Sequence, residues 1–172
     1  WNGSSWTQIG SSIQSVGIGD QFGWRVKISD DGTRIAAAGP KNRNVGDEIV
    51  GHVRIFDWDG NDWSQVGSEI EGDFDLGSQN ATLALDMSSD GKFVVLGEPL
   101  NENNDTGNGG AIGGRVSVYE DVDGVWTLFD TTLNTGRPTK NDMYYGRCVA
   151  LNGDGSKLTI SAHNDNLNTS GE

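Results

Sequence analysis

The sequence predicts an all-β fold built of propeller-type blades, each a sheet of four antiparallel strands. The chain repeats itself about every 60 residues, as stacked supersecondary units do: WTQIG at residues 6–10 returns as WSQVG at 63–67 and more loosely at 126–130. An Asp-Gly pair, the strongest short signal for a hairpin turn, returns at residues 31–32, 90–91 and 154–155. The 26 glycines in 172 residues are roughly twice the average share, as many tight turns require.

Four strands are expected in the first complete repeat. Residues 23–29 alternate apolar with polar side chains, which predicts a half-buried strand. The Asp31-Gly32 pair then turns the chain, because glycine adopts a positive φ at little cost. The remaining expected strands are residues 34–39, residues 51–57 after a polar loop, and a fourth from Trp63 to about Ile70.

The later repeats follow the same plan. In the second copy we expect strands at residues 84–88, 93–97, 114–120 and 126–133. In the third copy we expect strands at residues 147–151 and 157–161, with a third strand due where the sequence ends. Each expected strand is short and bounded by glycine, asparagine or aspartate, which is typical of an all-β protein.

The repeats predict one continuous segment over residues 1–172 rather than separate domains. Its expected parts are the outer strand of a preceding blade (1–13), two blades (22–70 and 81–133) and a partial blade (145–172). This is an incomplete propeller segment, with unpaired strand edges at both ends. A β-sandwich has similar strand spacing, but it does not repeat a four-strand motif in register.

The composition limits the classes of function. The net charge of −13, from 25 acidic and 12 basic side chains, repels phosphate groups and argues against nucleic acid as a partner. No apolar run approaches the ~18 residues of a membrane span, and the one cysteine excludes an internal disulfide framework. Four N-glycosylation patterns favour an extracellular or cell-surface location; they begin at Asn2, Asn80, Asn104 and Asn168.

Three short motifs of the first repeat resemble the FG-GAP type of propeller repeat. They are Asp20-Gln21-Phe22-Gly23, Ser29-Asp30-Asp31-Gly32 and Ala38-Gly39-Pro40. Later copies depart from the pattern, with Ala81-Thr82 for Phe-Gly and Gly97-Glu98-Pro99 for Gly-Ala-Pro. Extracellular and adhesive proteins, integrin α heads among them, carry such repeats. The resemblance therefore implies an adhesive, extracellular function, with the first strand of each unit innermost and the Trp strand outermost.

The same resemblance implies Ca²⁺ in the loop that joins the first and second strands, held by several spaced carboxylates. Calcium takes six to eight oxygen ligands. Only the turn at residues 152–155 keeps two oxygen ligands at alternate positions, Asn152 and Asp154, and no turn carries the later Asp that usually completes the shell. Any Ca²⁺ is therefore expected at Asn152 and Asp154; the alternative is that all three turns are plain hairpins.

A binding face is expected where the loops entering each first strand meet the loops between second and third strands, since scaffolds commonly carry function on loops. The candidate ligands for a cation or a sugar on this face are Asp73, Asp75, Glu98, Glu102, Asp105, Tyr144 and Tyr145. The alternative is that these residues belong to solvated loops. Trp6, Trp63 and Trp126 share one repeat position and are interpreted as packing residues.

No nucleophile elbow, zinc-protease motif or phosphate loop is present, and Cys148 is interpreted as a buried, unreactive thiol. We therefore expect a non-catalytic extracellular module for binding or adhesion, or a subunit of a surface assembly or filament. Its partners would be other proteins or copies of itself, joined through exposed strand edges, and also glycans. The alternatives are a lectin, which needs aromatic and polar residues repeated at equivalent positions, and part of a larger secreted enzyme.

Overall fold

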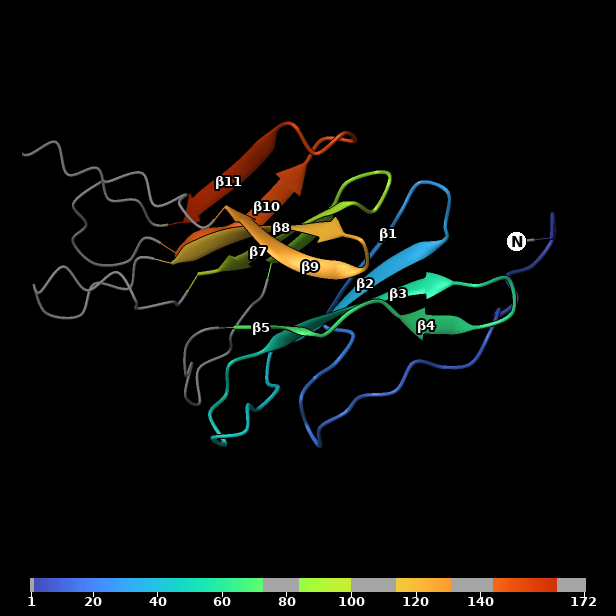
Figure 1. The fold of residues 1–172 in the computed structure, drawn as a ribbon, viewed down its shortest axis with the longest axis horizontal. Coiled ribbons are helices and arrows are strands. Elements are labelled where there is room, and N and C mark those ends of the chain that lie inside the picture. Colours follow the sequence, from blue (N-terminus) through green and yellow to red (C-terminus); the bar gives the residue numbers. More distant parts are fainter. Residues whose placement is uncertain (1, 73–83, 100–113, 131–143, 164–172) are drawn as a thin grey trace, which may run out of the picture.

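The computed structural model describes residues 2–72, 84–99, 114–130 and 144–163 (Figure 1). Within these ranges the chain forms eleven strands in antiparallel sheets, and none of the sheets closes on itself. The same ranges hold no helix, and hence none with the length and apolar character needed to cross a membrane. The all-β fold class predicted from the sequence is therefore confirmed.

The first sheet runs in chain order. Its strands are β1 (Arg25–Ile28), β2 (Arg34–Gly39), β3 (His52–Trp58) and β4 (Trp63–Gln65), and a short β5 (Ile70–Glu71) pairs with the other end of β3. The expected fourth strand over 63–70 is thus split in two. Gly67 lies between the two pieces with a φ of 66°, a left-handed conformation that breaks the regular ladder.

The second sheet has the same order, and the third sheet has two strands. The second consists of β6 (Ala84–Met87), β7 (Phe93–Glu98), β8 (Arg115–Val122) and β9 (Val125–Asp130). The third consists of β10 (Tyr144–Leu151) and β11 (Leu158–His163). Both sheets begin with a hairpin turned at an Asp-Gly pair, as predicted.

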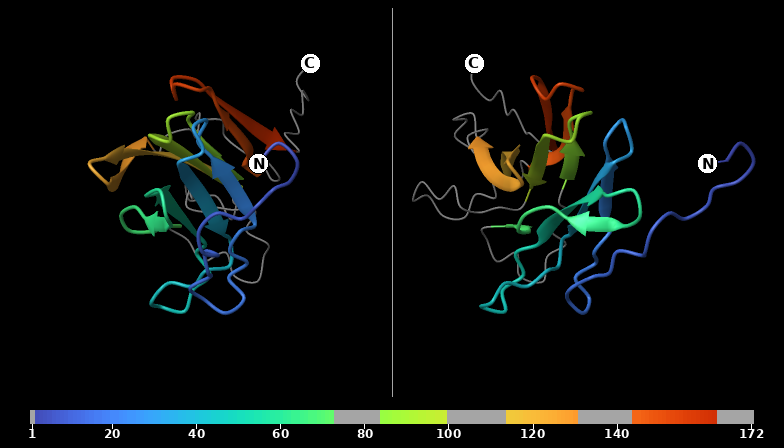
Figure 2. Two further views of the ribbon diagram at one scale, coloured as in Figure 1. Left: turned by 90° about the vertical axis from the view of Figure 1, so that its right-hand side faces the viewer. Right: turned by 45° about the vertical axis from the view of Figure 1, so that its right-hand side comes forward.

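The second sheet lies between the other two, and its strands β6 to β8 contribute to a core on each face, whereas β9 is largely exposed (Figures 1 and 2). Adjacent strand residues point to opposite faces, so Val94 packs toward the first sheet while Val95 packs toward the third. The first core joins Ala36, Ala38, Val53, Ile55 and Ile70 to Leu85, Met87, Val94 and Leu96. The second core joins Val95, Val116 and Val118 to Tyr145, Val149, Leu151, Leu158 and Ile160.

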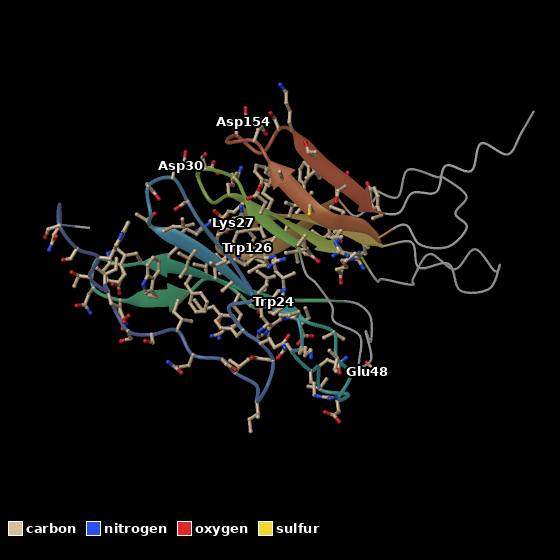
Figure 3. The ribbon with its side chains drawn as sticks, turned by 180° about the vertical axis from the view of Figure 1, so that it is seen from behind. Trp24, Lys27, Asp30, Glu48, Trp126 and Asp154 are labelled. Carbon is tan, nitrogen blue, oxygen red and sulfur yellow. The ribbon has the colours of Figure 1, made fainter. Side chains whose placement is uncertain are left out.

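Contacts between successive sheets recur at equivalent positions. The three Asp-Gly turns lie at one end of the stack, with Asp30 in the first and Asp154 in the third (Figure 3). The N–H of Asp30 donates to the carbonyl of Ser89 (2.9 Å), and the N–H of Ser89 donates to the carbonyl of Gly153 (2.8 Å). The repeat in the sequence therefore corresponds to a repeated way of joining one sheet to the next.

The N-terminal segment, residues 2–24, contains no strand. The strand expected over residues 1–13 is therefore not formed in the described part of that range, where no described strand forms a ladder with it. Its local geometry is nevertheless that of the repeat: Gly10 has a φ of 65° against 66° at the equivalent Gly67. Gly10 packs against Trp63 as Gly67 packs against Trp126.

Candidate functional site

The three Asp-Gly turns share a hydrogen-bond pattern that uses the proposed calcium ligands internally. In the third turn, Asp154 Oδ1 accepts from Asn152 Nδ2 (2.7 Å) and from the backbone of Ser156 (2.9 Å). In the first turn, Asp31 Oδ1 accepts from the Ser29 hydroxyl (2.7 Å) and from the backbone of Thr33 (2.9 Å). The hydroxyl of Ser29 and then the N–H of Thr33 lower the pKa of Asp31 below the ordinary value, and the hydroxyl of Ser156, which also donates to Asp154 Oδ1, does the same for Asp154 together with the N–H of Ser156. The turn itself thus accounts for both residue types, and calcium at Asn152 and Asp154 stays a prediction.

The described residues offer no ready-made metal site elsewhere. Among them, no three His, Cys, Asp or Glu side chains gather in a way that could hold a metal ion.

Two of the predicted binding-face residues lie in strands rather than in loops. Glu98 is the last residue of β7 and is only 5% exposed, with a carboxylate oxygen 3.7 Å from Arg115 Nε. Tyr145 lies in β10 and packs against the second core, and this burial raises the pKa of its phenol. Neither side chain therefore belongs to an exposed loop cluster, and the prediction is corrected for both.

The other predicted residues are placed only in part. Asn2 is exposed, and its side-chain oxygen accepts hydrogen bonds from the backbone of Ser4 and Ser5 at 3.0 and 2.9 Å. Tyr144 is the first residue of β10. The remaining candidates lie outside the described residues: Asp73, Asp75, Asn80, Glu102, Asn104, Asp105 and Asn168.

Trp126 is a packing residue as predicted, whereas Trp6 and Cys148 are more exposed than predicted. Trp126 packs against the first core and donates its Nε1–H to Val66 O (3.1 Å), so it is a packing residue as predicted. Trp6 shares that repeat position but is 84% exposed. Cys148 is exposed rather than buried, because it lies in a strand of the third sheet whose far face is not covered by any described element.

A buried histidine links the two loops at the other end of the first sheet. His52 is fully buried; its Nδ1 lies 2.6 Å from Glu69 Oε2, and its Nε2 lies 3.9 Å from Asp20 Oδ2. Burial alone would raise the pKa of Asp20, but the N–H groups of Phe22 and Gly17 donate to its carboxylate and, with other hydrogen bonds and His52, lower that pKa below the ordinary value.

We expect the Asp20 carboxylate to make the protein sensitive to acid. The unfolded aspartate has a pKa near 3.9 and the folded one a lower pKa, so the unfolded state takes up the proton first as the pH falls. The stabilisation is therefore complete above about pH 4 and is lost as the pH falls through the folded pKa. Urea denaturation at pH 7 and at pH 3 measures how much the free energy of unfolding falls on acidification, and this decrease should be smaller in Asp20→Asn than in the parent. Asp47→Asn, which changes an exposed aspartate, serves as the control. A decrease in Asp20→Asn as large as that of the parent would contradict the assignment.

The first sheet carries an apolar surface, on the side away from the second sheet, that no element of the described residues covers. Val26 and Ile28 are 65% and 61% exposed there, next to the partly buried Ile35; these three residues are named the open face. The N-terminal segment covers only the β3–β4 half of this side, where Arg54 binds Gln14 O (2.9 Å) and Asp62 binds the backbone of Ser11 (2.8 Å).

Two grooves lie at equivalent places between successive units. The first groove, about 350 Å³, is lined by residues 11–16 together with Arg54, Phe56, Asp62 and Trp63. The second groove, about 380 Å³, is lined by residues 67–71 together with Tyr119, Val125 and Trp126. Each is bounded by the segment at the repeated glycine of one unit (Gly10 or Gly67) and by the aromatic residues of the next. Aligning the repeats position by position shows from the sequence that the two sets of lining residues are equivalent, but the grooves themselves become visible only in the structure.

Comparison of the chain with protein-family models and with curated proteins finds no match. The FG-GAP resemblance therefore stays a prediction.

Proposed function

We propose that this chain is a non-catalytic extracellular module of propeller-type units, which acts by binding further units of the same kind, in copies of itself or in other proteins. The acidic surface and the four N-glycosylation patterns support the extracellular location. One structural observation supports the mode of binding, namely the open face of the first sheet. Its meaning comes from the equivalent positions in the second sheet.

The open face of the first sheet corresponds to a surface that is buried in the second sheet. Val26 and Ile28 hold the positions that Leu85 and Met87 hold in β6, since each set forms the same pairs with the next strand. Leu85 and Met87 pack against the first sheet and are only 5% and 8% exposed. In the third sheet, Val149 and Leu151 hold these positions and pack on the second core.

Burial of the open face would release a substantial free energy. Fully burying an exposed aliphatic side chain of this size stabilises by roughly 1.5–3 kcal/mol, and the open face carries two that are largely exposed, Val26 and Ile28. A contiguous apolar surface rimmed by polar residues is typical of an interaction site. Within the chain, the equivalent face of the second sheet packs on the side of the first sheet that carries Ala36, Ala38, Val53 and Ile55. That side is already buried, so a second copy would have to offer the far face of its third sheet, where Cys148 is exposed. The side of a repeat unit that receives the next sheet is therefore the proposed partner surface.

Self-association of the 172-residue chain tests this function. Sedimentation over a range of concentrations should show association of the parent, and the double variant Val26→Asp/Ile28→Asp should raise the midpoint concentration by at least about tenfold, because each charge would have to be desolvated. Val122→Asp, which alters an exposed valine outside the open face, should behave like the parent. A parent that stays monomeric throughout, or a double variant that associates equally well, would contradict the proposal.

A further inference from the structure

Three equivalent positions of the repeats form the contact between neighbouring Asp-Gly turns (Figure 3). They are Asp30, Ser89 and Gly153, each the residue before the aspartate of its turn. Each turn gives an N–H to the turn of the next sheet and offers its own carbonyl to the turn of the preceding sheet. Among the described residues, the N–H of Gly153 has no acceptor and the carbonyl of Asp30 has no donor, so the series stops at these two groups.

A second contact also recurs where one sheet meets the next. The side chain two residues after each turn glycine lies over the turn glycine of the following sheet. Arg34 Nη1 donates to the carbonyl of Gly91 (3.2 Å), and a methyl group at Gly91 would lie 2.6 Å from Arg34 Cδ. A methyl group at Gly155 would likewise lie 2.6 Å from the Phe93 ring. The two junctions of the chain are therefore built in one register.

The two ends of the stack lack this second contact in the described residues. A methyl group at Gly32, in the first turn, would meet only the side chain of Ile28, at 3.9 Å. In the third sheet, Lys157 holds the position of Arg34 and Phe93, and it is exposed. A second copy placed against the first sheet in the same register would therefore bring its lysine over the open turn glycine.

The far face of the third sheet is shaped to receive the open face. In the first sheet, the small side chains of Ala36 and Ala38 receive the aliphatic side chains of β6. Thr159 and Ser161 hold the equivalent positions in β11, beside the exposed Cys148. Small side chains at these positions leave room for the valine and isoleucine side chains of the open face.

We propose that the open face of one copy docks on the far face of the third sheet of a second copy, in the register that joins successive sheets within the chain. The N–H of Gly153 then donates to the carbonyl of Asp30 in the next copy, and Lys157 lies over the first turn glycine of that copy. This inference rests on the proposed association of like units and adds the residues that meet. Because the two surfaces differ, the contact repeats from copy to copy and gives linear assemblies rather than a two-fold dimer.

A designed disulfide tests this register. A methyl group at Gly153 would lie 3.6 Å from Ser89 Cβ, within the range of about 3.5–4.5 Å between the Cβ atoms of a disulfide. In the proposed register, residue 153 meets residue 30 of the next copy as residue 89 meets residue 153 within the chain. Asp30→Cys/Gly153→Cys should therefore join separate copies, whereas Ser89→Cys/Gly153→Cys should close within one chain. Both variants also carry Cys148→Ala, which removes the native thiol.

The size and number of the cross-linked species decide the result. After mild oxidation, Asp30→Cys/Gly153→Cys should give dimers, trimers and longer species that disappear on reduction. The product should exceed at least about fivefold that of Asn61→Cys/Gly153→Cys, whose first cysteine lies in another exposed turn of the first sheet. Equal cross-linking in the two pairs would overturn the register. Efficient dimers of Asp30→Cys alone would overturn it too, because they would mean that two open faces meet.

The parent chain separates this inference from the proposed function. Exchange of the Gly153 amide hydrogen should slow as the concentration rises into the range where the chain associates, because that N–H becomes hydrogen-bonded. Association through Val26 and Ile28 without this protection, and without the disulfide between copies, would mean that the register is wrong while the proposed function stands. A parent that stays monomeric would contradict both.

Discussion

Replacing Arg34 with alanine should lower the free energy of unfolding by about 3 kcal/mol, because this side chain ties the first sheet to the second. Its Nε and Nη2 bind the carboxylate of Asp57 in β3 (2.6 and 2.8 Å), and its Nη1 binds Asp121 in β8 (2.6 Å). The Arg34 side chain is 16% exposed and that of Asp121 is 13% exposed. Hydrogen bonds from the guanidinium to Asp57 and then to Asp121 raise the pKa of Arg34, so it stays charged.

The expected loss of unfolding free energy depends on how well water can solvate the two carboxylates that remain without Arg34. Removing one member of a buried ion pair costs about 3–5 kcal/mol, because the remaining charge is left desolvated. The Asp57 side chain is 43% exposed and regains water, so the lower end of that range applies. Arg34 Nη1 also donates to Gly91 O (3.2 Å), in the turn between β6 and β7, and this contact with the second sheet disappears too.

Urea denaturation of Arg34→Ala and a matched variant measures this effect. Lys92→Ala removes an ion pair with Glu120 in which the lysine side chain is 51% exposed, so its loss of stability should be much smaller. Arg34→Lys should fall between the parent and Arg34→Ala, because an ammonium keeps the charge but cannot span both carboxylates. A loss in Arg34→Ala no larger than in Lys92→Ala would show that the sheets are held together without this bridge.

The strands of the fold follow from local sequence patterns, and these were predictable. The second strand, residues 34–39, has the observed bounds, because a turn glycine and Pro40 mark its two ends. The Asp-Gly turns were predictable for the same reason. The division of the fourth strand at Gly67 was not, because a glycine is compatible with a continuous strand until the neighbouring unit is placed against it.

Burial was harder to predict than strands, since alternation shows that two faces exist but not what covers them. Cys148 and Ala84 share a repeat position, yet the cysteine is exposed while the alanine is 7% exposed. Val26 and Leu85 differ in the same way. In each pair the sequence pattern is alike, and only the presence of an adjacent sheet separates them. The open face therefore could not be recognised before the sheets were placed.

The charged contacts were missed because they join distant segments. Arg34, Asp57 and Asp121 lie on three strands of two sheets, and no local motif connects them.

Replacing Gly97 with alanine should destabilise the protein by about 1–3 kcal/mol and should loosen the third sheet in particular. Gly97 lies in β7 where the backbone of β10 passes directly over it. A methyl group there would fall inside the van der Waals radius of Gly146 O, 2.9 Å from Gly146 C and 3.1 Å from Ala84 Cβ. The two strands would have to separate, which would open the second core around Val95 and Val116.

The sign of this effect distinguishes it from an ordinary glycine substitution. Where space and backbone permit, Gly→Ala is neutral or stabilising by about 0.4–1 kcal/mol, because it reduces the conformational entropy of the unfolded chain. Gly17→Ala is the matched control, since its methyl group would meet nothing closer than 3.6 Å and its φ is not positive. Hydrogen exchange should then accelerate in β10 and β11 of Gly97→Ala, with β2 and β3 less affected. Equal stability of the two variants would mean that β10 does not lie against β7 in solution.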